Sequence, residues 1–587
     1  MSGWRAFLWF AVLVSFVASG LAHAADNAQR QIIIAKSESD YDLLKTQFVA
    51  EGGKVAMEMR KIFSFVGIAP MEVHQTNATL AKAKSKGLYQ VGSDQIRHII
   101  RPSQKEDFFG TPDRTTMAPF ASSRIAVPAF LQAAFKPDPA FNLAGLMWNY
   151  SRIHAKSAWS MTRGKPKVLV GVADTGLDYT HSELANKVTD VVDLTDPTLC
   201  KTYVDPYKSD ADWAATYGGP VDTDWNGHGT WIGGNIAAVV DDYGINGIAP
   251  RVGLVSLKIS EWCGYCWDSS IIYAFLRAVD LGVDVVSISF GGYTNRNDPA
   301  QEATYQLYEA VVQYAQSMGT VIVAAAGNEH VRIDATGKVL SHGSLTEPGS
   351  KLDNYYEWYD TPAGVPGVVM VSSTGNKVET PSDSCASGTF ENDNATCKPK
   401  SDPHQSFGVG KKDQLAYYSN YGPRIDIAAP GGARKFNLPY WDRGGTPGYP
   451  VTTDSYQAWE EFSITSNWAL DIPCYNLSGV FPANQCYSTI QGTSMATPHV
   501  SAVMALVSSY KAAAHKNPKE LIRIVKAGAR QVVGNKTPPL SNGDRRKGDL
   551  TGIACKTGYC HLGGAPISDR EAYGAGIVDA YGALNAQ

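Results

Sequence analysis

The chain has 587 residues, of which 44% are hydrophobic and 18% charged, and its formal net charge is -4. This composition is typical of a globular protein with a large core. The nearly balanced charge and the lack of a basic run give no support to nucleic-acid binding or to an anionic membrane partner.

Residues 1–24 have the pattern of a signal peptide. Arg5 precedes an apolar stretch from Phe7 to Val17, and Ala22-His23-Ala24 is a small-x-small cleavage site. The alternative is a membrane anchor, but the stretch is short for spanning, and no later segment is apolar enough to cross a bilayer. We therefore expect a soluble exported protein, either extracellular or periplasmic.

Residues 25–101 predict a separate small unit. Its expected elements are, in chain order, a strand at Gln31–Ala35, a helix at Asp40–Val49, a strand region at Glu58–Ala69, a helix at Thr79–Lys86 and a strand at Leu88–Ile100. With two strands counted in the region Glu58–Ala69, the strand-helix-strand-strand-helix-strand order favours a small antiparallel α/β sandwich.

The segment 102–144 contains six prolines and reads as a linker or an extended arm. If the first unit is removed by proteolysis, we expect the cut in or near this segment. Arg101 and Arg114 are candidate sites for another protease.

Residues 145–587 alternate strands and helices. The expected strands are near-continuous apolar runs at Lys167–Ala173, Leu254–Ile259, Val283–Phe290 and Thr320–Ala326. The expected helices are Ser270–Leu281, Gln301–Met318 and Ser494–Tyr510. Strands of this kind are buried on both faces of a parallel sheet. The pattern predicts a doubly wound α/β fold, whose active residues lie at the carboxyl ends of strands.

Three short segments place polar side chains at the ends of these elements. Asp174 ends an apolar strand, His228 stands in a glycine turn, and Ser494 enters a helix. Each has a structural alternative, as a cap or a turn residue. Together they supply the nucleophile, the base and the orienting anion that amide hydrolysis needs.

In this order, Asp, His and Ser resemble the triad of the subtilisin-like serine proteases. The resemblance implies that Ser494 attacks the scissile carbonyl, that His228 is the general base and that Asp174 orients the imidazole. Asn328, after the strand Val321–Gly327, matches the family residue that donates its side-chain amide to the oxyanion. His499 matches a structural position.

The resemblance also extends to the unit 25–101, which is similar in pattern to the inhibitory propeptide of the family. Its implied role is to assist folding and to block the cleft until it is cut away. The alternative is a permanent binding module.

The substrate groove is placed by resemblance. Ser289-Phe290-Gly291-Gly292 matches the segment that pairs with substrate backbone, and glycines there let a peptide approach closely. Ala325 to Gly327 would form another wall. Asp360 matches the pocket floor, where a carboxylate would favour Arg or Lys before the cut; the alternative is a solvated loop residue.

Two further expectations concern cross-links and ions. The nine cysteines favour export, and the economical pairing is Cys263–Cys266, Cys385–Cys397, Cys474–Cys486 and Cys555–Cys560, with Cys200 left over. Proximity in sequence does not establish connectivity. Glu183 and Asp241 match ligands of a structural calcium in the family, with a surface turn as the alternative. No cofactor is needed for the chemistry.

The sequence thus predicts a monomeric secreted serine endopeptidase that acts on proteins or peptides and is made as a precursor inhibited by its own propeptide. A narrow processing protease that prefers basic residues is the nearest alternative. A catalytically inactive relative that binds peptides is another, although all four catalytic positions are filled.

Overall fold

The computed structural model describes residues 28–70, 89–99, 147–205, 207–242, 244–341, 355–376, 412–416, 418–433, 464–467, 486–532 and 567–587. The chain divides into two compact units. The first comprises residues 1–94 and 297–304, and the second comprises residues 95–296 and 305–587. Each unit is described by itself.

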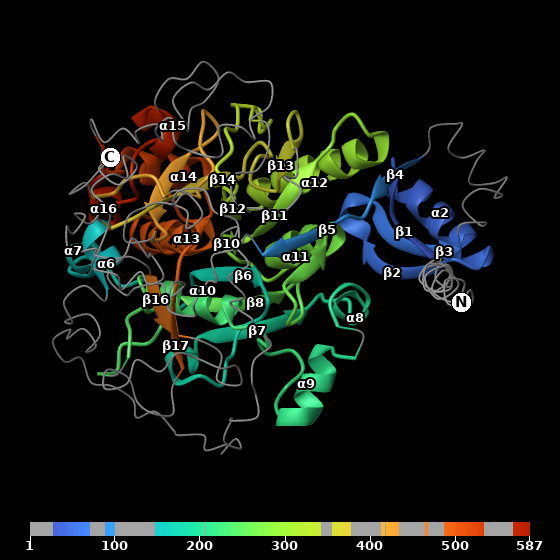
Figure 1. Ribbon diagram of the computed structural model, residues 1–587, viewed down its shortest axis with the longest axis horizontal. Helices are drawn as coiled ribbons and strands as arrows, with labels where there is room; N and C mark the ends of the chain where they lie inside the picture. Colours follow the sequence, from blue (N-terminus) through green and yellow to red (C-terminus); the bar gives the residue numbers. More distant parts are fainter. Residues whose placement is uncertain are drawn as a thin grey trace, which may run out of the picture. The chain divides into compact units, whose positions relative to one another are not determined.

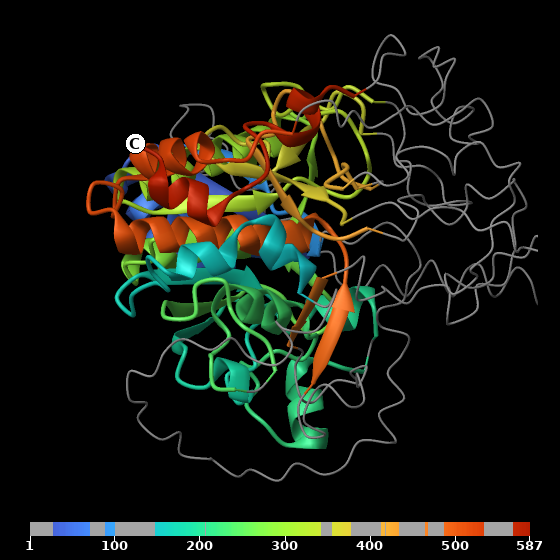
Figure 2. The same ribbon diagram turned by 90° about the vertical axis from the view of Figure 1, so that its left-hand side faces the viewer.

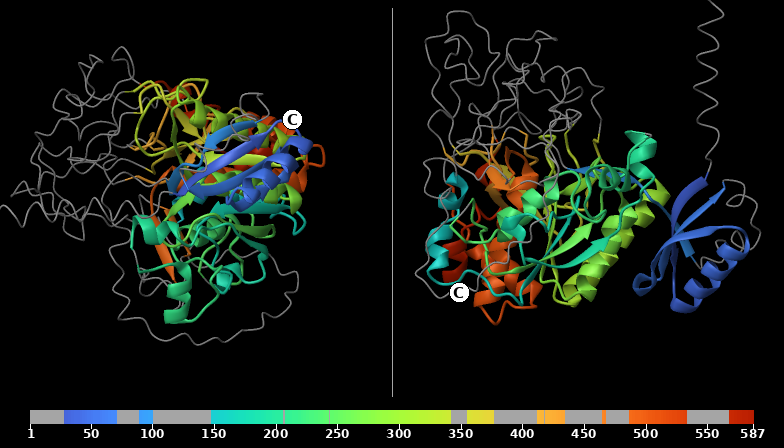
Figure 3. Two further views of the ribbon diagram at one scale, coloured as in Figure 1. Left: turned by 90° about the vertical axis from the view of Figure 1, so that its right-hand side faces the viewer. Right: turned by 90° about the horizontal axis from the view of Figure 1, so that it is seen from below.

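The first unit is a four-stranded antiparallel sheet with one described helix on its face (Figure 3). The sheet order is β2-β3-β1-β4. Helix α2 buries Tyr41, Leu44 and Phe48 against Ile33 and Phe65 of the sheet. The elements are β1 (Ala28–Ala35), α2 (Glu38–Ala50), β2 (Lys54–Met59), the 3-10 turn η1 (Arg60–Ile62), β3 (Ser64–Pro70) and β4 (Tyr89–Ser93).

Two predicted strand segments of this unit are interrupted in the structure. The region Glu58–Ala69 is split by η1, after which Phe63 adopts a left-handed conformation that turns the chain into β3. The expected strand Leu88–Ile100 forms β4 and, after a break, β5 (Ile96–Ile99), which belongs to a different sheet in the second unit. The expected helix Thr79–Lys86 lies outside the described residues.

The second unit is built on a seven-stranded parallel sheet (Figure 1). Its order is β15-β14-β12-β10-β6-β8-β7. The strands are β6 (Leu169–Asp174), β7 (Val188–Asp193), β8 (Gly253–Lys258), β10 (Val285–Ile288), β12 (Val321–Ala325), β14 (Val369–Thr374) and β15 (Ile427–Pro430). The central strands are buried and mostly apolar because helices cover both faces of the sheet.

Helices α10 (His228–Ala237) and α13 (Thr493–Tyr510) pack on one face and enclose Val170 and Val172 of β6 in the main core. Helix α11 (Asp268–Asp280) contacts β6 and β8. Ala173 of β6 and Val255 of β8 are also buried. Figure 2 shows α13 as the long orange helix with α14 (Pro518–Ala527) and α16 (Ala580–Asn585) beside it. The predicted α/β fold class, a parallel sheet flanked by helices, is confirmed.

The second unit also contains a small antiparallel sheet of order β13-β11-β5-β9. Besides β5, it consists of β9 (Tyr265–Trp267), β11 (Phe290–Thr294) and β13 (Tyr359–Thr361). The remaining elements are α6 (Trp148–Arg152), α7 (Ala155–Trp159), η3 (Ser182–Leu184), α8 (Leu199–Tyr203), α9 (Asp210–Tyr217), α12 (Pro299–Ser317), β16 (Ile464–Asn467), β17 (Tyr487–Ile490) and α15 (Asp569–Tyr573). Within the described ranges, no helix has both the length and the apolarity to cross a membrane.

Candidate active site

Three adjacent strands of the parallel sheet bring polar residues to one edge. Asp174 is the last residue of β6, Ser289 follows β10, and Asn328 follows β12 by three positions. These strands are neighbours in the order β12-β10-β6, and their carboxyl ends meet at the same edge because they are parallel. The sheet therefore gathers the residues that the sequence placed at strand ends.

Asp174 and His228 form a buried hydrogen-bonded pair. The Nδ1–H of His228 donates to Oδ1 of Asp174 over 2.7 Å, and the Asp174 side chain is fully buried. The backbone N–H of Thr175 donates to the same oxygen over 2.8 Å. Since Nδ1 faces the carboxylate, Nε2 is the ring nitrogen available to a reacting group.

A second carboxylate, Asp224, builds the turn that presents His228. Its Oδ1 accepts hydrogen bonds from the backbone N–H groups of Asn226 and Gly227 and from Thr175 Oγ1. Its Oδ2 accepts from the backbone N–H and the hydroxyl of Thr230, at 2.8 and 2.7 Å. The sequence analysis missed Asp224; an Asp just before an Asn-Gly turn is the signal that could have indicated it.

The turn also needs a close backbone approach. A Cβ added to Gly229 would lie 2.0 Å from the carbonyl oxygen of Gly176, in the loop that follows Asp174. The glycine after His228 therefore lets α10 start directly against the end of β6.

Ser494 and Asn328 meet at the start of α13. Ser494 is the second residue of the helix and is buried. Asn328 Oδ1 accepts hydrogen bonds from the N–H and the hydroxyl of Thr493, at 2.9 and 2.8 Å. This orients Nδ2 to the Gly492 side, where an added Cβ would lie 3.5 Å from it. Ser289 Oγ donates to the carbonyl oxygen of Ser494 over 3.2 Å, which ties the helix start to the end of β10.

The predicted substrate strand is paired with a segment of the same chain. In β11, Phe290 lies opposite Ile99 and Gly291 lies opposite His98 of β5. On its other side β5 pairs with β9, and the N–H of Ile99 donates to the carbonyl of Gly264. Strand β5 therefore pairs with the segment that the sequence analysis expects to pair with substrate, and it lies between that segment and β9.

The predicted pocket walls lie at the ends of β12 and in β13. Ala325 ends β12 and is buried, and Gly327 has a positive φ of 98°. Asp360 is buried in β13 opposite Tyr293. Burial, followed by the nearby Glu329 carboxylate, raises the pKa of Asp360 well above its ordinary value. Glu329, which accepts from the Tyr293 hydroxyl over 2.7 Å, is a second acidic group here that the sequence analysis missed.

Two residues near the motifs have structural hydrogen bonds. His499 donates from Nδ1 to the Met495 carbonyl and accepts at Nε2 from Asn149, and burial lowers its pKa to about 4. Asp178 Oδ1 accepts from the N–H and hydroxyl of Thr180, as in an Asx turn. For His499 these contacts agree with the structural position that the sequence analysis gave it, and the contacts of Asp178 are those of a turn residue.

The calcium expectation concerns Glu183 and the loop of Asp241. The N–H of Val239 donates to the Glu183 carbonyl, and the N–H of Ile245 and the hydroxyl of Tyr487 donate to Glu183 Oε1. In the part of the chain that is described, no cluster of three or more His, Cys, Asp or Glu side chains could hold a metal. A calcium ion at this loop would therefore rely largely on carbonyl oxygens.

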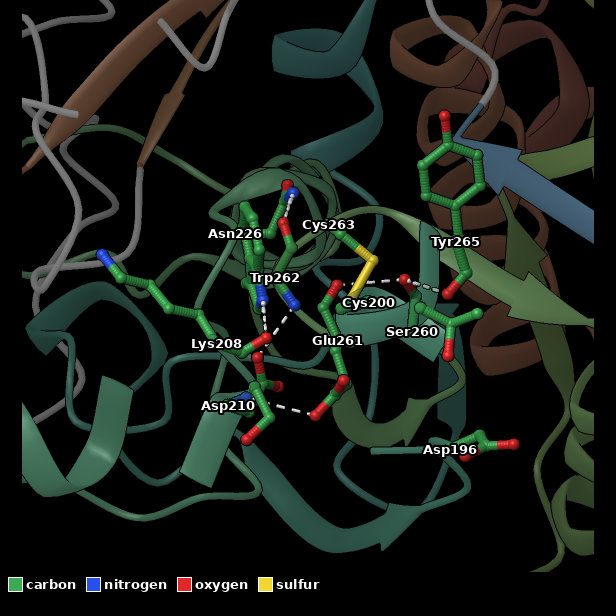
Figure 4. The surroundings of a disulfide bond; sticks show 12 residues. Asp196, Cys200, Lys208, Asp210, Asn226, Ser260, Glu261, Trp262, Cys263 and Tyr265 are labelled. Atoms are coloured by element: carbon green, nitrogen blue, oxygen red, sulfur yellow. Dashed lines mark hydrogen bonds between the residues drawn. A yellow bond between two sulfur atoms is a disulfide. The ribbon is translucent and has the colours of Figure 1, made fainter. Parts of the chain in front are cut away.

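One predicted disulfide is wrong. Cys263 is bonded to Cys200 rather than to Cys266, with a Cα–Cα distance of 5.7 Å (Figure 4). Cys266 lies within β9, while helix α8 brings Cys200 to the loop before that strand. Cys486 is also disulfide-bonded. The other cysteines of the predicted pairs, Cys385, Cys397, Cys474, Cys555 and Cys560, lie outside the described residues.

Comparisons with known proteins agree with this geometry. The model of the subtilase family matches residues 165–548. A thermophilic serine proteinase of Bacillus sp. (strain AK1) is 28% identical over 314 residues, which cover 51% of this chain and 69% of that protein. Thermitase of Thermoactinomyces vulgaris is 25% identical over 373 residues, which cover 63% and 85%.

A solved structure extends the likeness in fold. The epidermin leader peptide processing serine protease EpiP from Staphylococcus aureus has a TM-score of 0.57 at 18% identity, with 95% of this chain and 98% of that chain covered. At this identity the comparison concerns the fold alone.

Proposed function

Because this chain belongs to the subtilase family and is a serine endopeptidase, we propose that Ser494 is its nucleophile, His228 its general base and Asp174 the group that orients the base. The 2.7 Å hydrogen bond between His228 Nδ1 and the buried Asp174 carboxylate carries the proposal. It fixes the imidazole tautomer and stabilises the imidazolium that forms when the base takes a proton.

The proposed reaction follows from these roles. Ser494 Oγ attacks the carbonyl carbon of the scissile bond while His228 Nε2 accepts the hydroxyl proton, which it then gives to the leaving amine. A water molecule, activated by the same imidazole, hydrolyses the acyl-enzyme. The developing oxyanion would be met by the Asn328 side-chain amide and the Ser494 backbone N–H at the start of α13.

We further propose that the enzyme is exported and made as a self-inhibited precursor. The signal-peptide pattern of residues 1–24 supports export. The pairing of β5 with both β9 and β11 supports self-inhibition, because a peptide substrate that adds a strand there would need the place that β5 occupies. Cleavage after this strand and its release would open the groove.

A narrower specificity for basic residues before the cut is a second candidate. Asp360 and Glu329 supply two acidic groups near the expected pocket floor, and the raised pKa of Asp360 reflects a carboxyl buried beside another one. A cation that entered the pocket would favour the ionised form of Asp360. A peptide panel that differs only at the residue before the cut tests it; a preference for Phe or Leu over Arg would contradict it.

The proposed chemistry is tested with the full-length chain and its Ser494→Ala variant, produced without other proteases. Intact mass and hydrolysis of casein are measured for each. We expect loss of the N-terminal unit and casein hydrolysis in the wild type only. The control is Ser501→Ala, a buried serine two helical turns further along α13. Equal activity of Ser494→Ala and the wild type would overturn the assignment, and an inactive wild type would favour the peptide-binding alternative.

A further inference from the structure

The side chain of Arg97 in β5 is enclosed by polar groups. Only 3% of it is exposed. Its Nε and Nη2 donate to the two oxygens of Asp268 over 2.6 and 3.0 Å, in a bidentate pair. Nη2 also donates to Thr294 Oγ1 over 2.8 Å, and Nη1 donates to the carbonyl of Tyr293 over 3.0 Å. The Gln95 side chain, from the same segment as Arg97, accepts a further bond from Nη2.

The other groups that hold Arg97 belong to elements that lie outside β5. Asp268 is the first residue of α11, and Tyr293 and Thr294 end β11. The hydroxyl of Tyr308, on α12, donates to Asp268 Oδ1 over 2.8 Å and fixes the carboxylate. Since Asp268, Tyr293 and Thr294 are held by α11 and β11, removal of β5 would leave a polar pocket with the Asp268 carboxylate at its base.

The pocket also has the space that an arginine needs. A Cβ added to Gly292 would lie 3.1 Å from Arg97 Nη1 and 3.4 Å from its Cδ. The glycine of β11 therefore lets the side chain pass close to the strand on its way to Asp268. This gives Gly292, already predicted as a substrate-binding residue, a specific steric role.

The register of β5 relates this pocket to the bond that would be cut. Ile99 lies opposite Phe290 and His98 opposite Gly291, so Arg97 follows at Gly292. In the opposite direction, Ser289 immediately precedes Phe290 and β11. Its hydroxyl donates to the carbonyl oxygen of Ser494. A substrate strand in this register would put its residue before the scissile bond level with Ser289. Counting back from there, the fourth residue before the bond stands where Arg97 stands.

We propose that this pocket selects arginine at the fourth residue before the cleaved bond (P4) of protein substrates, and that Asp268 is the carboxylate that recognises it. This rests on the proposed function, because it treats β5 as a substrate-like strand in the groove. The substrate class is therefore peptides with Arg at P4.

The donor geometry separates arginine from other residues. A guanidinium presents several N–H groups in one plane and matches the two Asp268 oxygens, the Thr294 hydroxyl and the Tyr293 carbonyl together. A lysine is a single point charge and cannot make the bidentate pair. An apolar residue at P4 would cover the buried Asp268 carboxylate and leave it with the Tyr308 hydroxyl but without a positively charged partner, which is strongly unfavourable.

The test uses wild-type enzyme that has matured from the full-length chain. Quenched fluorescent peptides share all positions except P4, which is Arg, Lys, citrulline or Leu; citrulline keeps the shape of arginine and lacks its charge. We expect kcat/KM for Arg to exceed that for citrulline by about 30-fold or more, which is in the range for loss of one partner of a buried charge pair. In Asp268→Asn the ratio should fall below about threefold.

Asp280→Asn, at the other end of α11, is the matched control and should keep the wild-type ratio. An Arg-to-citrulline ratio near one in the wild type, or an unchanged ratio in Asp268→Asn, would overturn the proposal. If Asp268→Asn does not mature, the mature wild type is instead inhibited with a synthetic peptide of residues 95–100 and with its Arg97→Ala version. The Arg97→Ala peptide should inhibit at least about tenfold more weakly than the unchanged peptide. Equal inhibition by the two peptides would overturn the proposal.

Labelling with a fluorophosphonate separates this inference from the function beneath it. An enzyme that reacts with the probe and cleaves all peptides without P4 selectivity overturns only the arginine pocket. An enzyme that neither reacts with the probe nor cleaves any peptide overturns the proposed function and the pocket's role with it.

Discussion

Asp224 offers a sharp test of how the site is positioned, because its hydrogen bonds go to the turn that presents His228 and to Thr175, which is next to Asp174. We consider Asp224→Asn, which keeps the shape of the side chain. The bonds from Asn226, Gly227 and Thr175 to Oδ1 can be retained by the amide oxygen. The new NH2 group, however, would face the backbone N–H of Thr230, which now donates to Oδ2 over 2.8 Å.

The magnitude follows from this one mismatch. A buried N–H without an acceptor costs about 1–3 kcal/mol, and hydrogen bonds to a charged acceptor are stronger than those to a neutral amide. We therefore expect the free energy of unfolding to fall by about 3 kcal/mol. If half of that loss is also felt in the transition state, through a displaced imidazole, kcat/KM falls about tenfold.

Urea unfolding and peptide hydrolysis measure the two effects. The decrease should lie mainly in kcat, since Asp224 contacts the turn of His228 rather than the groove strands. Asp222→Asn is the control, because Asp222 lies two residues before Asp224 and accepts a hydrogen bond from the Tyr179 hydroxyl instead of from the turn of His228. An Asp224→Asn enzyme within twofold of wild type in kcat/KM, and no less stable than Asp222→Asn, would refute the reasoning.

Three further predictions follow from the structure. The register of β5 predicts that self-processing cuts after Ile100, so intact mass and N-terminal sequencing of the mature enzyme should give Arg101 as the first residue; a cut elsewhere in 102–144 would contradict the register. Burial and the nearby Asp210 carboxylate raise the pKa of Glu261 to about 7, so the free energy of unfolding falls as the pH rises to that value. In urea unfolding, Glu261→Gln should therefore be more stable than wild type by about 2 kcal/mol at pH 8 and equal to it at pH 4. If the loop of Asp241 binds calcium, a chelator should lower the melting temperature, and an unchanged melting temperature would remove the ion from the proposal.

The sheet and the edge where the site lies could be predicted because their signals are local. One apolar run ends in Asp174 and another leads to Asn328. In each case a single segment of the sequence predicts both the strand and the polar residue at its end. The predicted family and its fold class are confirmed for the same reason. The roles of the individual site residues stay predictions.

The features that could not be predicted depend on partners far apart in the chain. Cys263 has a neighbour three residues away, yet it is bonded to Cys200 across a sequence separation of 63. Near this disulfide, Asp210 and Glu261 also come from distant parts of the chain. The backbone N–H of Asp210 donates to Glu261 Oε1 (Figure 4). No periodicity or spacing in the sequence reports such pairings.

Arg97 illustrates the same limit at the substrate groove. In the sequence it is one arginine in a short strand, and nothing near it gives it a role. Its meaning comes from Asp268, 171 residues away, and from a glycine in β11 that leaves it room. If one carboxylate serves both the inhibitory strand and the substrate, then tight self-inhibition and arginine selectivity have the same physical origin. A change at Asp268 should therefore weaken both together, whereas a purely structural contact would affect inhibition alone.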